Sequence, residues 1–283
     1  MTRWRRLAER GGTRRPCAGG DAEFGLAACA EMVRRHDGVR FRIVRLAPPE
    51  ARSHLHVLFA FNLEIARIPW AVTEAGLGAI RLQWWQDVIE AAARGEAVPH
   101  AEIPTPLAAR IRAGLFDTDA LAALVVARTR DLASDMFADR EAFEAYLEAT
   151  GGGLLAEAGR ALGADGAARA LLHRLGTIDG LARYLSALPA LAARGRRPLP
   201  PGLADEAALS ELIAAARAEL AALRPALRRL PAELRPVAAL AFAARPLLSR
   251  MRRAPRKVLS APGVRLSPLA REWAVRRAVF LGP

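Results

Sequence analysis

The sequence predicts an all-α protein, and three observations support this prediction. The chain of 283 residues is dominated by Ala, Leu, Arg and Glu, which enter helices at little cost in conformational entropy. Apolar residues recur at helical spacing, as at Leu58, Phe61 and Ile65. No segment shows the alternation of a strand, and no repeat of fixed period occurs. A hydrophobic fraction of 52% is large enough for a sizeable core.

Residues 1–20 differ in character from the rest of the chain. They combine Arg pairs, two Gly-Gly steps and Pro16, a composition typical of disordered segments. We therefore expect a disordered basic arm over 1–20 and one helical domain over 21–283.

The helices of this domain are predicted from apolar periodicity and from capping residues. Pro69 is expected to stop or kink the second helix, and Gly95 is expected to end the third. The glycine-rich stretch over 150–159 is predicted to be a flexible bend or a close helix contact rather than a ligand cradle. The expected helices cover residues 22–37, 47–68, 77–95, 106–115, 119–136, 139–162, 166–194, 204–222, 232–253 and 267–279.

The charge of the chain is strongly basic, with a formal net charge of +13. Such a charge favours an anionic partner, which includes nucleic acid, anionic lipid and diphosphates. A second interpretation stays open, because Lys257 is the only lysine and an Arg-rich, Ala-rich chain is typical of a GC-rich coding sequence. The basic residues are densest over 2–15 and 249–257. No recognised nucleic-acid-binding module accompanies them, so we expect no nucleic-acid partner.

Cysteine usage and hydropathy restrict the location of the protein. Cys17 and Cys29 form no disulfide framework, which favours a reducing compartment. The basic beginning of the chain has no apolar region after it and does not resemble a secretory signal, although an Arg-rich targeting peptide remains an alternative. No window approaches the roughly 18–20 apolar residues of a membrane span. We expect a soluble or membrane-peripheral protein.

The histidines do not form a metal site in the sequence pattern. His54 and His56 are two residues apart and lie on opposite sides of one helix, so they cannot share a metal ion. His36, His100 and His173 are scattered along the chain. Surface or structural histidines are therefore expected.

Two long stretches of the chain resemble the squalene/phytoene synthase family. The stretch LFAFNLEIARIPWAVTE over 58–74, followed by IRLQWWQDVIEAAARG, is similar to the first half of the family. The stretch LGTIDGLARYLSALPALAARGRRPLP over 175–200 is similar to its second conserved block. Order and spacing agree over residues 22 to about 275. The resemblance implies a single-domain, isoprenoid-synthase-type helical bundle around a central cavity.

The resemblance also implies where metal-binding carboxylates belong. Active members carry two Asp-rich clusters on facing helices, and these clusters hold Mg²⁺ ions that bridge the substrate diphosphates. Here the first pair of acidic positions falls on Ala66 and Trp70, with Arg67 between them. The second pair falls on Ala187 and Leu191. We therefore expect no catalytic residue and no metal or other cofactor, with Mg²⁺ only if the chain is an active transferase after all.

The resemblance supplies two sets of candidate site residues. The former Asp-motif faces, expected to line the cavity, comprise Asn62, Ala66, Trp70, Arg183, Ala187 and Leu191. The polar residues expected near the cavity comprise Glu64, Arg67, Gln83, Asp87 and Arg196. Glu64, Asp87 and Asp179 offer an alternative metal site. The other interpretation of these acids is that they are solvated or paired with Arg, as isolated acids on helices usually are.

The departures from the family pattern resemble one of its branches. The AFN-x-E and R-x-Q-aromatic-W phrases and the GR…LP loop are similar to the branch that contains a mitochondrial respiratory complex I assembly factor and its bacterial relatives. This resemblance implies a non-catalytic helper, peripheral to the inner membrane, on the cytoplasmic side in a bacterium or the matrix side in a mitochondrion. Its implied partners are complex I subunits or assembly intermediates.

Two other hypotheses remain beside the assembly helper. The first is an active prenyltransferase of the squalene/phytoene synthase type that condenses two prenyl diphosphates by means of displaced acids. The second is a lipid-binding or prenyl-binding protein, in which the cavity holds an apolar chain and Arg183 or Arg67 meets its polar head. An anionic membrane surface is a further expected partner, which the basic side chains of Arg250, Arg252 and Arg253 are predicted to contact.

Overall fold

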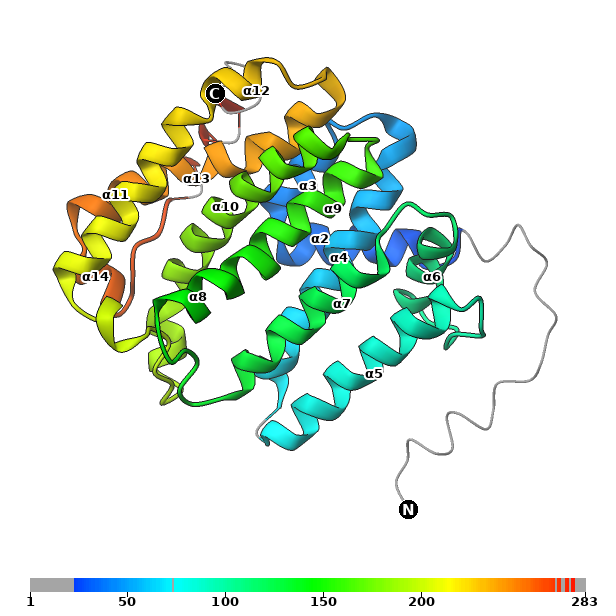
Figure 1. Ribbon diagram of the computed structural model, residues 1–283, viewed down its shortest axis with the longest axis horizontal. Helices are drawn as coiled ribbons and strands as arrows, with labels where there is room; N and C mark the ends of the chain where they lie inside the picture. Colours follow the sequence, from blue (N-terminus) through cyan, green and yellow to red (C-terminus); the bar gives the residue numbers. More distant parts are fainter. Residues whose placement is uncertain (1–22, 73, 268, 271–272, 275, 278–283) are drawn as a thin grey trace.

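The computed structural model describes residues 23–72, 74–267, 269–270, 273–274 and 276–277. The predicted arm over 1–20, including Cys17, lies outside these residues. The prediction of an all-α fold is confirmed, since the described residues form helices and turns, with one isolated bridge between Asp135 and Arg197 and no named strand (Figure 1).

The elements follow one another along the chain with short connections. The α-helices are α2 (Leu26–His36), α3 (Gly38–Val44), α4 (Pro49–Ala71), α5 (Ala75–Ala93), α6 (Pro104–Arg112), α7 (Thr118–Ala127), α8 (Arg140–Leu147), α9 (Gly153–Ala161), α10 (Gly166–Ala192), α11 (Glu206–Ala222), α12 (Arg224–Arg228), α13 (Arg235–Arg253) and α14 (Arg256–Leu259). Short 3₁₀ segments cover Arg128–Leu132, Pro201–Leu203 and Ala232–Leu234, and a π-helix covers Glu148–Gly152.

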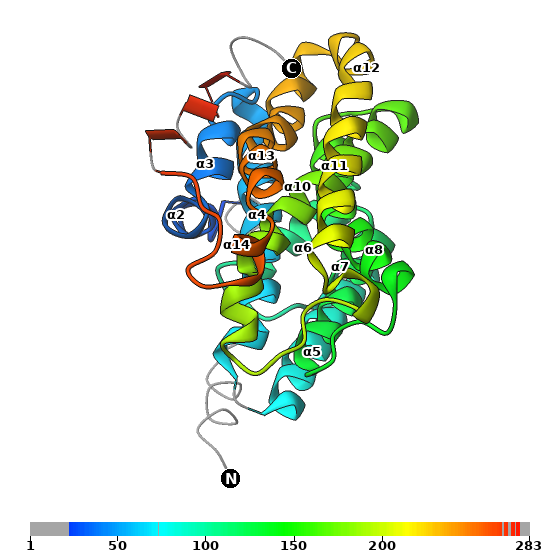
Figure 2. The ribbon, with the colours of Figure 1, turned by 90° about the vertical axis from the view of Figure 1, so that its left-hand side faces the viewer.

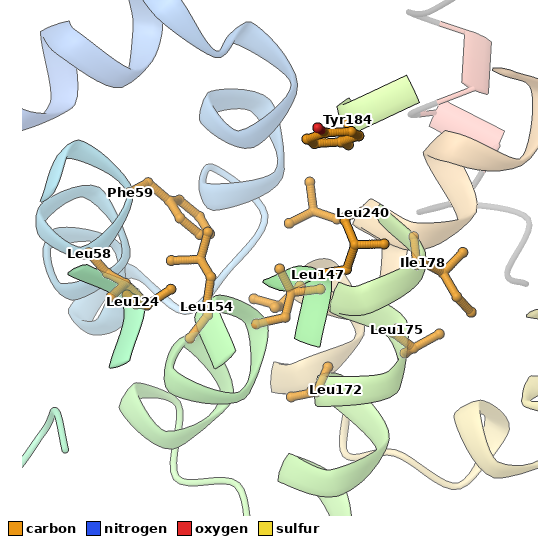
Figure 3. Packing of buried hydrophobic residues seen from close by; sticks show 14 of the residues in the cluster. Leu58, Phe59, Leu124, Leu147, Leu154, Leu172, Leu175, Ile178, Tyr184 and Leu240 are labelled. Atoms are coloured by element: carbon orange, nitrogen blue, oxygen red, sulfur yellow. The ribbon is translucent and has the colours of Figure 1, made fainter. Parts of the chain in front are cut away.

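Helix α10 lies at the centre of the arrangement. It packs against the π-helix, α9 and α13, while α4 packs against α2, α5 and α9 (Figure 2). Buried apolar side chains from these helices, together with others from α7 and α8, form one core (Figure 3). Its labelled members are Leu58, Phe59, Leu124, Leu147, Leu154, Leu172, Leu175, Ile178, Tyr184 and Leu240.

Asp37 divides the first predicted helix from a second that was not expected. The carboxylate of Asp37 accepts a hydrogen bond of 3.0 Å from the backbone N–H of Arg40, which caps α3. The chain therefore breaks at Asp37 and begins α3 at Gly38. This cap brings Arg40 into the interior, where its side chain matters for the site described below.

Pro69 does not stop α4 at the expected position. The helix continues through Pro69 and ends at Ala71. A proline is tolerated there because only two helical residues follow it. The carbonyl oxygens of this last turn find partners on another segment: Arg196 donates to the Pro69 oxygen at 3.2 Å, and Arg194 donates to the Trp70 oxygen at 3.1 Å.

The glycine-rich stretch is a close helix contact, one of the two alternatives that the sequence left open. The predicted helix over 139–162 is divided into α8, the π-helix and α9. A Cβ atom on Gly151 would lie 2.4 Å from the backbone oxygen of Gly176, and one on Gly176 would lie 2.3 Å from the oxygen of Gly151. Glycine at both positions lets the π-helix contact the backbone of α10 directly.

The remaining boundaries differ modestly from the predicted ones. Helix α7 ends at Ala127, nine residues before the predicted end, and continues as a 3₁₀ turn. Helices α12 and α14 were not predicted, and the predicted helix over 267–279 lies partly outside the described residues. Within the part of the chain that the structure describes, no helix has both the length and the apolar character needed to cross a bilayer.

Candidate functional site

A cavity of about 280 Å³ lies where α3, α4, α8 and α10 meet. The former Asp-motif faces come together here: α4 contributes three residues and α10 contributes three. These six residues, all of which line the cavity, are Asn62, Ala66, Trp70, Arg183, Ala187 and Leu191. Each set recurs at intervals of four, so its members lie on one face of their helix.

The polar residues expected near the cavity are placed less uniformly. Arg196 lines it. Arg67 is exposed and its Nη1 lies 3.4 Å from Nε2 of His36, whereas Gln83 donates a 2.9 Å hydrogen bond to Asp87 on the exposed face of α5. Four of the expected residues do not line the cavity, namely Glu64, Arg67, Gln83 and Asp87.

The alternative metal site is not formed. Glu64, Asp87 and Asp179 do not converge, and within the described ranges no group of three or more His, Cys, Asp or Glu side chains is placed to hold a metal ion. Helix geometry explains the separation, because Glu64 is two residues from Asn62 and from Ala66 and therefore lies on a different face of α4.

Two carboxylates and two guanidiniums form a cluster at one wall of the cavity, in which the side chain of Arg183 is 36% exposed. Arg183 donates to Asp37 and to Asp179, each at 2.7 Å. Arg40 lies 3.4 Å from Asp37 and 3.7 Å from Asp179. Arg40, Asp37 and Asp179 are almost fully buried. The guanidinium of Arg40 also lies 5.2 Å from the centre of the Phe59 ring.

The protonation of this cluster follows from burial and from its opposite charges. Burial acts to raise the pKa of Asp37, but the guanidiniums of Arg183 and Arg40 outweigh it and hold that pKa below its usual range. Burial, with the nearby charge of Arg183, lowers the pKa of Arg40 to about 10. Burial opposes the charged form of Arg183 as well, yet Asp179 and Asp37 raise its pKa. The ionised forms of Asp37, Arg40 and Arg183 are therefore favoured at neutral pH.

A second polar group lies across the cavity. Tyr146 donates to Asp131 at 2.9 Å and accepts a 2.6 Å hydrogen bond from Arg128, which is also 3.2 Å from Asp131. Burial raises the pKa of the Tyr146 hydroxyl above its usual range. The tyrosine consequently keeps its proton and acts as a hydrogen-bond donor.

Four lining residues carry buried polar atoms that have no hydrogen-bond partner among the residues that the structure describes. They are Asn62 Oδ1, Arg40 Nε, Arg128 Nε and Arg196 Nη1. Most buried polar groups in proteins are satisfied. A polar ligand or a water molecule in the cavity would supply the missing partners.

A larger hollow of about 640 Å³ lies beside the cavity. Arg196 lines both spaces. The lining of the larger one is mainly apolar and includes Phe137, Leu188, Leu199 and Leu259. The two spaces together place a polar region next to an apolar one.

The cavity residues do not fit the Mg²⁺ ions that the related synthases require. The acids that line the cavity are Asp37 and Asp131, and each is already paired with a guanidinium, as is the neighbouring Asp179. Mg²⁺ needs free oxygen ligands in near-octahedral order. The positive charge of Arg40 and Arg183 also opposes a cation at this position.

The sequence did not point to most members of the two polar groups. Asp37, Arg40, Arg128, Asp131 and Tyr146 were all missed. Asp37 had one readable signal, since an Asp-Gly step after an Arg-rich helix end is typical of a new N-cap. The others gave no signal of a site. Arg128 and Asp131 are an ordinary pair three residues apart, and only packing brings Tyr146 to Asp131 and Arg40 to Asp179.

The fold and the cavity together define the class of the protein as an isoprenoid-synthase-like helical fold. The family model for squalene/phytoene synthase matches residues 33–270. The chain therefore belongs to the squalene/phytoene synthase family.

Solved structures agree with this fold. The squalene synthase HpnC from Alicyclobacillus acidocaldarius superposes with a TM-score of 0.67 at 18% identity, covering 81% of this chain and 93% of that one. A dehydrosqualene synthase in complex with ligand gives a TM-score of 0.72 at 12% identity, covering 89% of this chain and 94% of that one. At these identities the likeness concerns the fold alone.

Curated relatives are more similar in sequence and differ in what they are named for. The chain is 29% identical to the Bos taurus NADH dehydrogenase (ubiquinone) complex I, assembly factor 6, over 70% of this chain and 60% of the relative. It is 28% identical to the Homo sapiens protein of the same name, over 61% of this chain and 52% of the relative. The chain thus spans little more than half the length of these relatives.

Proposed function

We propose that this protein is a non-catalytic member of the squalene/phytoene synthase family that assists the assembly of respiratory complex I. One observation carries the proposal: the four positions of the family's metal-binding acids are Ala66, Trp70, Ala187 and Leu191, and all four line the cavity. The similarity to complex I assembly factors supports the specific role.

The remaining acids of the cavity support the absence of prenyl transfer. A diphosphate leaving group needs a cation that bridges its oxygens. In this chain the acids hold guanidiniums instead, and the resulting ion pairs join α3 to α10. The cluster is suited to holding the walls of the cavity together, because its charges are matched within the protein.

The assembly role is proposed to operate at the inner membrane, with complex I subunits or assembly intermediates as partners. The net charge of +13 favours contact with anionic lipid. The cavity and its apolar neighbour are suited to one ligand class, an apolar chain of lipid or prenyl type with a polar head. Asn62 and Arg128 would meet the head, and the hollow around Phe137 and Leu188 would take the chain.

Deletion of the gene tests the proposal directly. We expect a loss of assembled complex I and of its NADH oxidation activity, with unchanged carotenoid and hopanoid content. A loss of isoprenoid products with intact complex I would contradict it. Complementation with the wild-type gene should restore assembly.

The alternative of an active prenyltransferase is tested with the purified protein. It is incubated with Mg²⁺ and farnesyl or geranylgeranyl diphosphate, and the products are separated by chromatography. We expect no condensation product above the uncatalysed background. Turnover in the usual range of enzymes, about 1 per second or faster, would overturn the non-catalytic assignment.

A further inference from the structure

A separate hollow of about 260 Å³ lies between α11 and α13, which pack side by side (Figures 1 and 2). Four arginines line it. They are Arg217 on α11, Arg224 at the start of α12, and Arg245 and Arg252 on α13. Arg245 and Arg252 are seven residues apart on α13, so their side chains lie on the same face of that helix. The floor is formed by small or apolar residues, namely Ala214, Ala218, Leu220 and Ala221.

No acid belongs to this hollow. Its lining contains no Asp or Glu, and within the described part of the chain none of the four arginines forms an ion pair. Arg217 in addition has a buried Nε atom without a hydrogen-bond partner. Partial burial and the neighbouring charges of Arg224, Arg277 and Arg217 lower the pKa of Arg245. The guanidiniums therefore repel one another, and no described residue supplies them with a counter-ion.

We infer that this hollow is a binding site for a phosphate group. Guanidiniums bind phosphate oxygens through paired N–H donors. Several arginines that converge without acids form the usual protein site for a phosphorylated group. The alanines on the floor leave room for such a group between α11 and α13, and a bound phosphate would also relieve the mutual repulsion of the four cations. Its source is either a lipid headgroup or free phosphate.

The inference goes beyond the proposed function, because the hollow shares no lining residue with the cavity between α4 and α10. A phosphate site at this place is independent of whether the protein assists complex I or binds a lipid in the cavity. Its test accordingly uses purified full-length protein and requires no assembly readout.

The experiment compares wild type with the double variant Arg217→Gln, Arg245→Gln. Binding is measured by flotation with vesicles of phosphatidylcholine alone and of phosphatidylcholine mixed with phosphatidylglycerol, and by calorimetric titration with inorganic phosphate. Where the source is lipid, we expect binding to the mixed vesicles that the double variant weakens roughly 30-fold, about fivefold for each charge. Where the source is free phosphate, we expect saturable binding of inorganic phosphate that the double variant loses.

A matched control separates the site from general basic charge. The variant Arg228→Gln, Arg229→Gln removes the same charge from exposed residues that do not line the hollow. We expect it to retain binding within about threefold, since charges outside the site are screened by salt. Circular dichroism confirms that both variants are folded. Equal losses in the two variants, or no binding to either probe by wild type, would overturn the inference.

Discussion

The cavity between α4 and α10 and the hollow between α11 and α13 are both rich in arginine, yet their arginines have opposite surroundings. In the cavity, Arg183 is bound by Asp37 and Asp179. In the hollow, Arg217 and Arg245 lie near other arginines, and none of the described lining residues is an acid. The same residue type therefore supports structure in one place and offers a site to an anion in the other. The difference is set by the residues that the fold brings opposite each guanidinium.

The largest effect is expected from Arg183→Met. It leaves Asp37 and Asp179 buried with Arg40 as their remaining partner, and breaking a buried ion pair from one side is costly. We expect a loss of about 3 kcal/mol in the free energy of unfolding, measured with urea.

The matched control for this variant is Arg174→Met on the same helix. Arg174 pairs with Glu219 at 3.0 Å, and both side chains are largely exposed. Exposed pairs contribute about 1 kcal/mol or less. Equal losses for Arg174→Met and Arg183→Met would show that the cavity cluster has no special structural role.

A smaller loss in the free energy of unfolding is expected from Gly176→Ala. This variant tests the contact between the π-helix and α10, the helix that carries Arg183. The new methyl group would lie 2.3 Å from the backbone oxygen of Gly151 and would force the π-helix away from α10. We expect a loss of about 2 kcal/mol. In Gly166→Ala, at the exposed start of α10, no atom lies within 4 Å of the new methyl group, so this variant should be neutral or slightly stabilised. Similar losses of stability in Gly176→Ala and Gly166→Ala would contradict a specific contact between Gly151 and Gly176.

Lowering the pH should reduce the stabilisation that the carboxylates of the cavity cluster provide. No such loss is expected at the hollow, because its described lining contains no carboxylate. The pKa of Asp37 in the folded protein lies below its value in the unfolded chain. The stabilisation is therefore present above the unfolded value of about 4 and is lost as the pH falls through the folded pKa. Urea unfolding between neutral pH and pH about 3 should show this decline, and Asp37→Asn should make it shallower. Parallel profiles for wild type and Asp37→Asn would exclude the assignment.

The smallest effect, of opposite sign, is expected in the hollow. Arg245→Gln removes a charge that the neighbouring guanidiniums repel. In phosphate-free, low-salt buffer we expect a gain of about 0.3 kcal/mol in the free energy of unfolding. Added salt should reduce this gain by screening. A loss comparable with that of Arg183→Met would mean that Arg245 has a structural partner.

The sequence predicted much of the helical framework. The long helices α4, α5 and α10 were expected close to their observed ranges, since their apolar periodicity is unbroken. The break at Asp37 and the π-helix before Gly153 were not predicted. The break at Asp37 has a local cause, the N-cap of α3, whose signal was overlooked. The π-helix depends on a tertiary contact, which places Gly151 against Gly176.

The candidate site was predicted in part, through the resemblance to the squalene/phytoene synthase family. The six former Asp-motif positions, from Asn62 to Leu191, were expected at the cavity and line it. The ion pairs were not expected, because Asp37 and Arg183 are 146 residues apart and neither carries a local signal of the other. Proximity of this kind arises only when helices pack.

The sequence by itself determined which side chains stand where the resemblance to the family places metal-binding acids. Ala66, Trp70, Ala187 and Leu191 cannot coordinate Mg²⁺ in any fold, because they carry no carboxylate. Tertiary structure alone decided what became of the remaining charges. It neutralised Arg183 against two buried acids and placed no described acid in the lining of the hollow between α11 and α13. The physical reason is that electrostatic interactions depend on distance in space and on burial, and neither quantity can be read from positions along the chain.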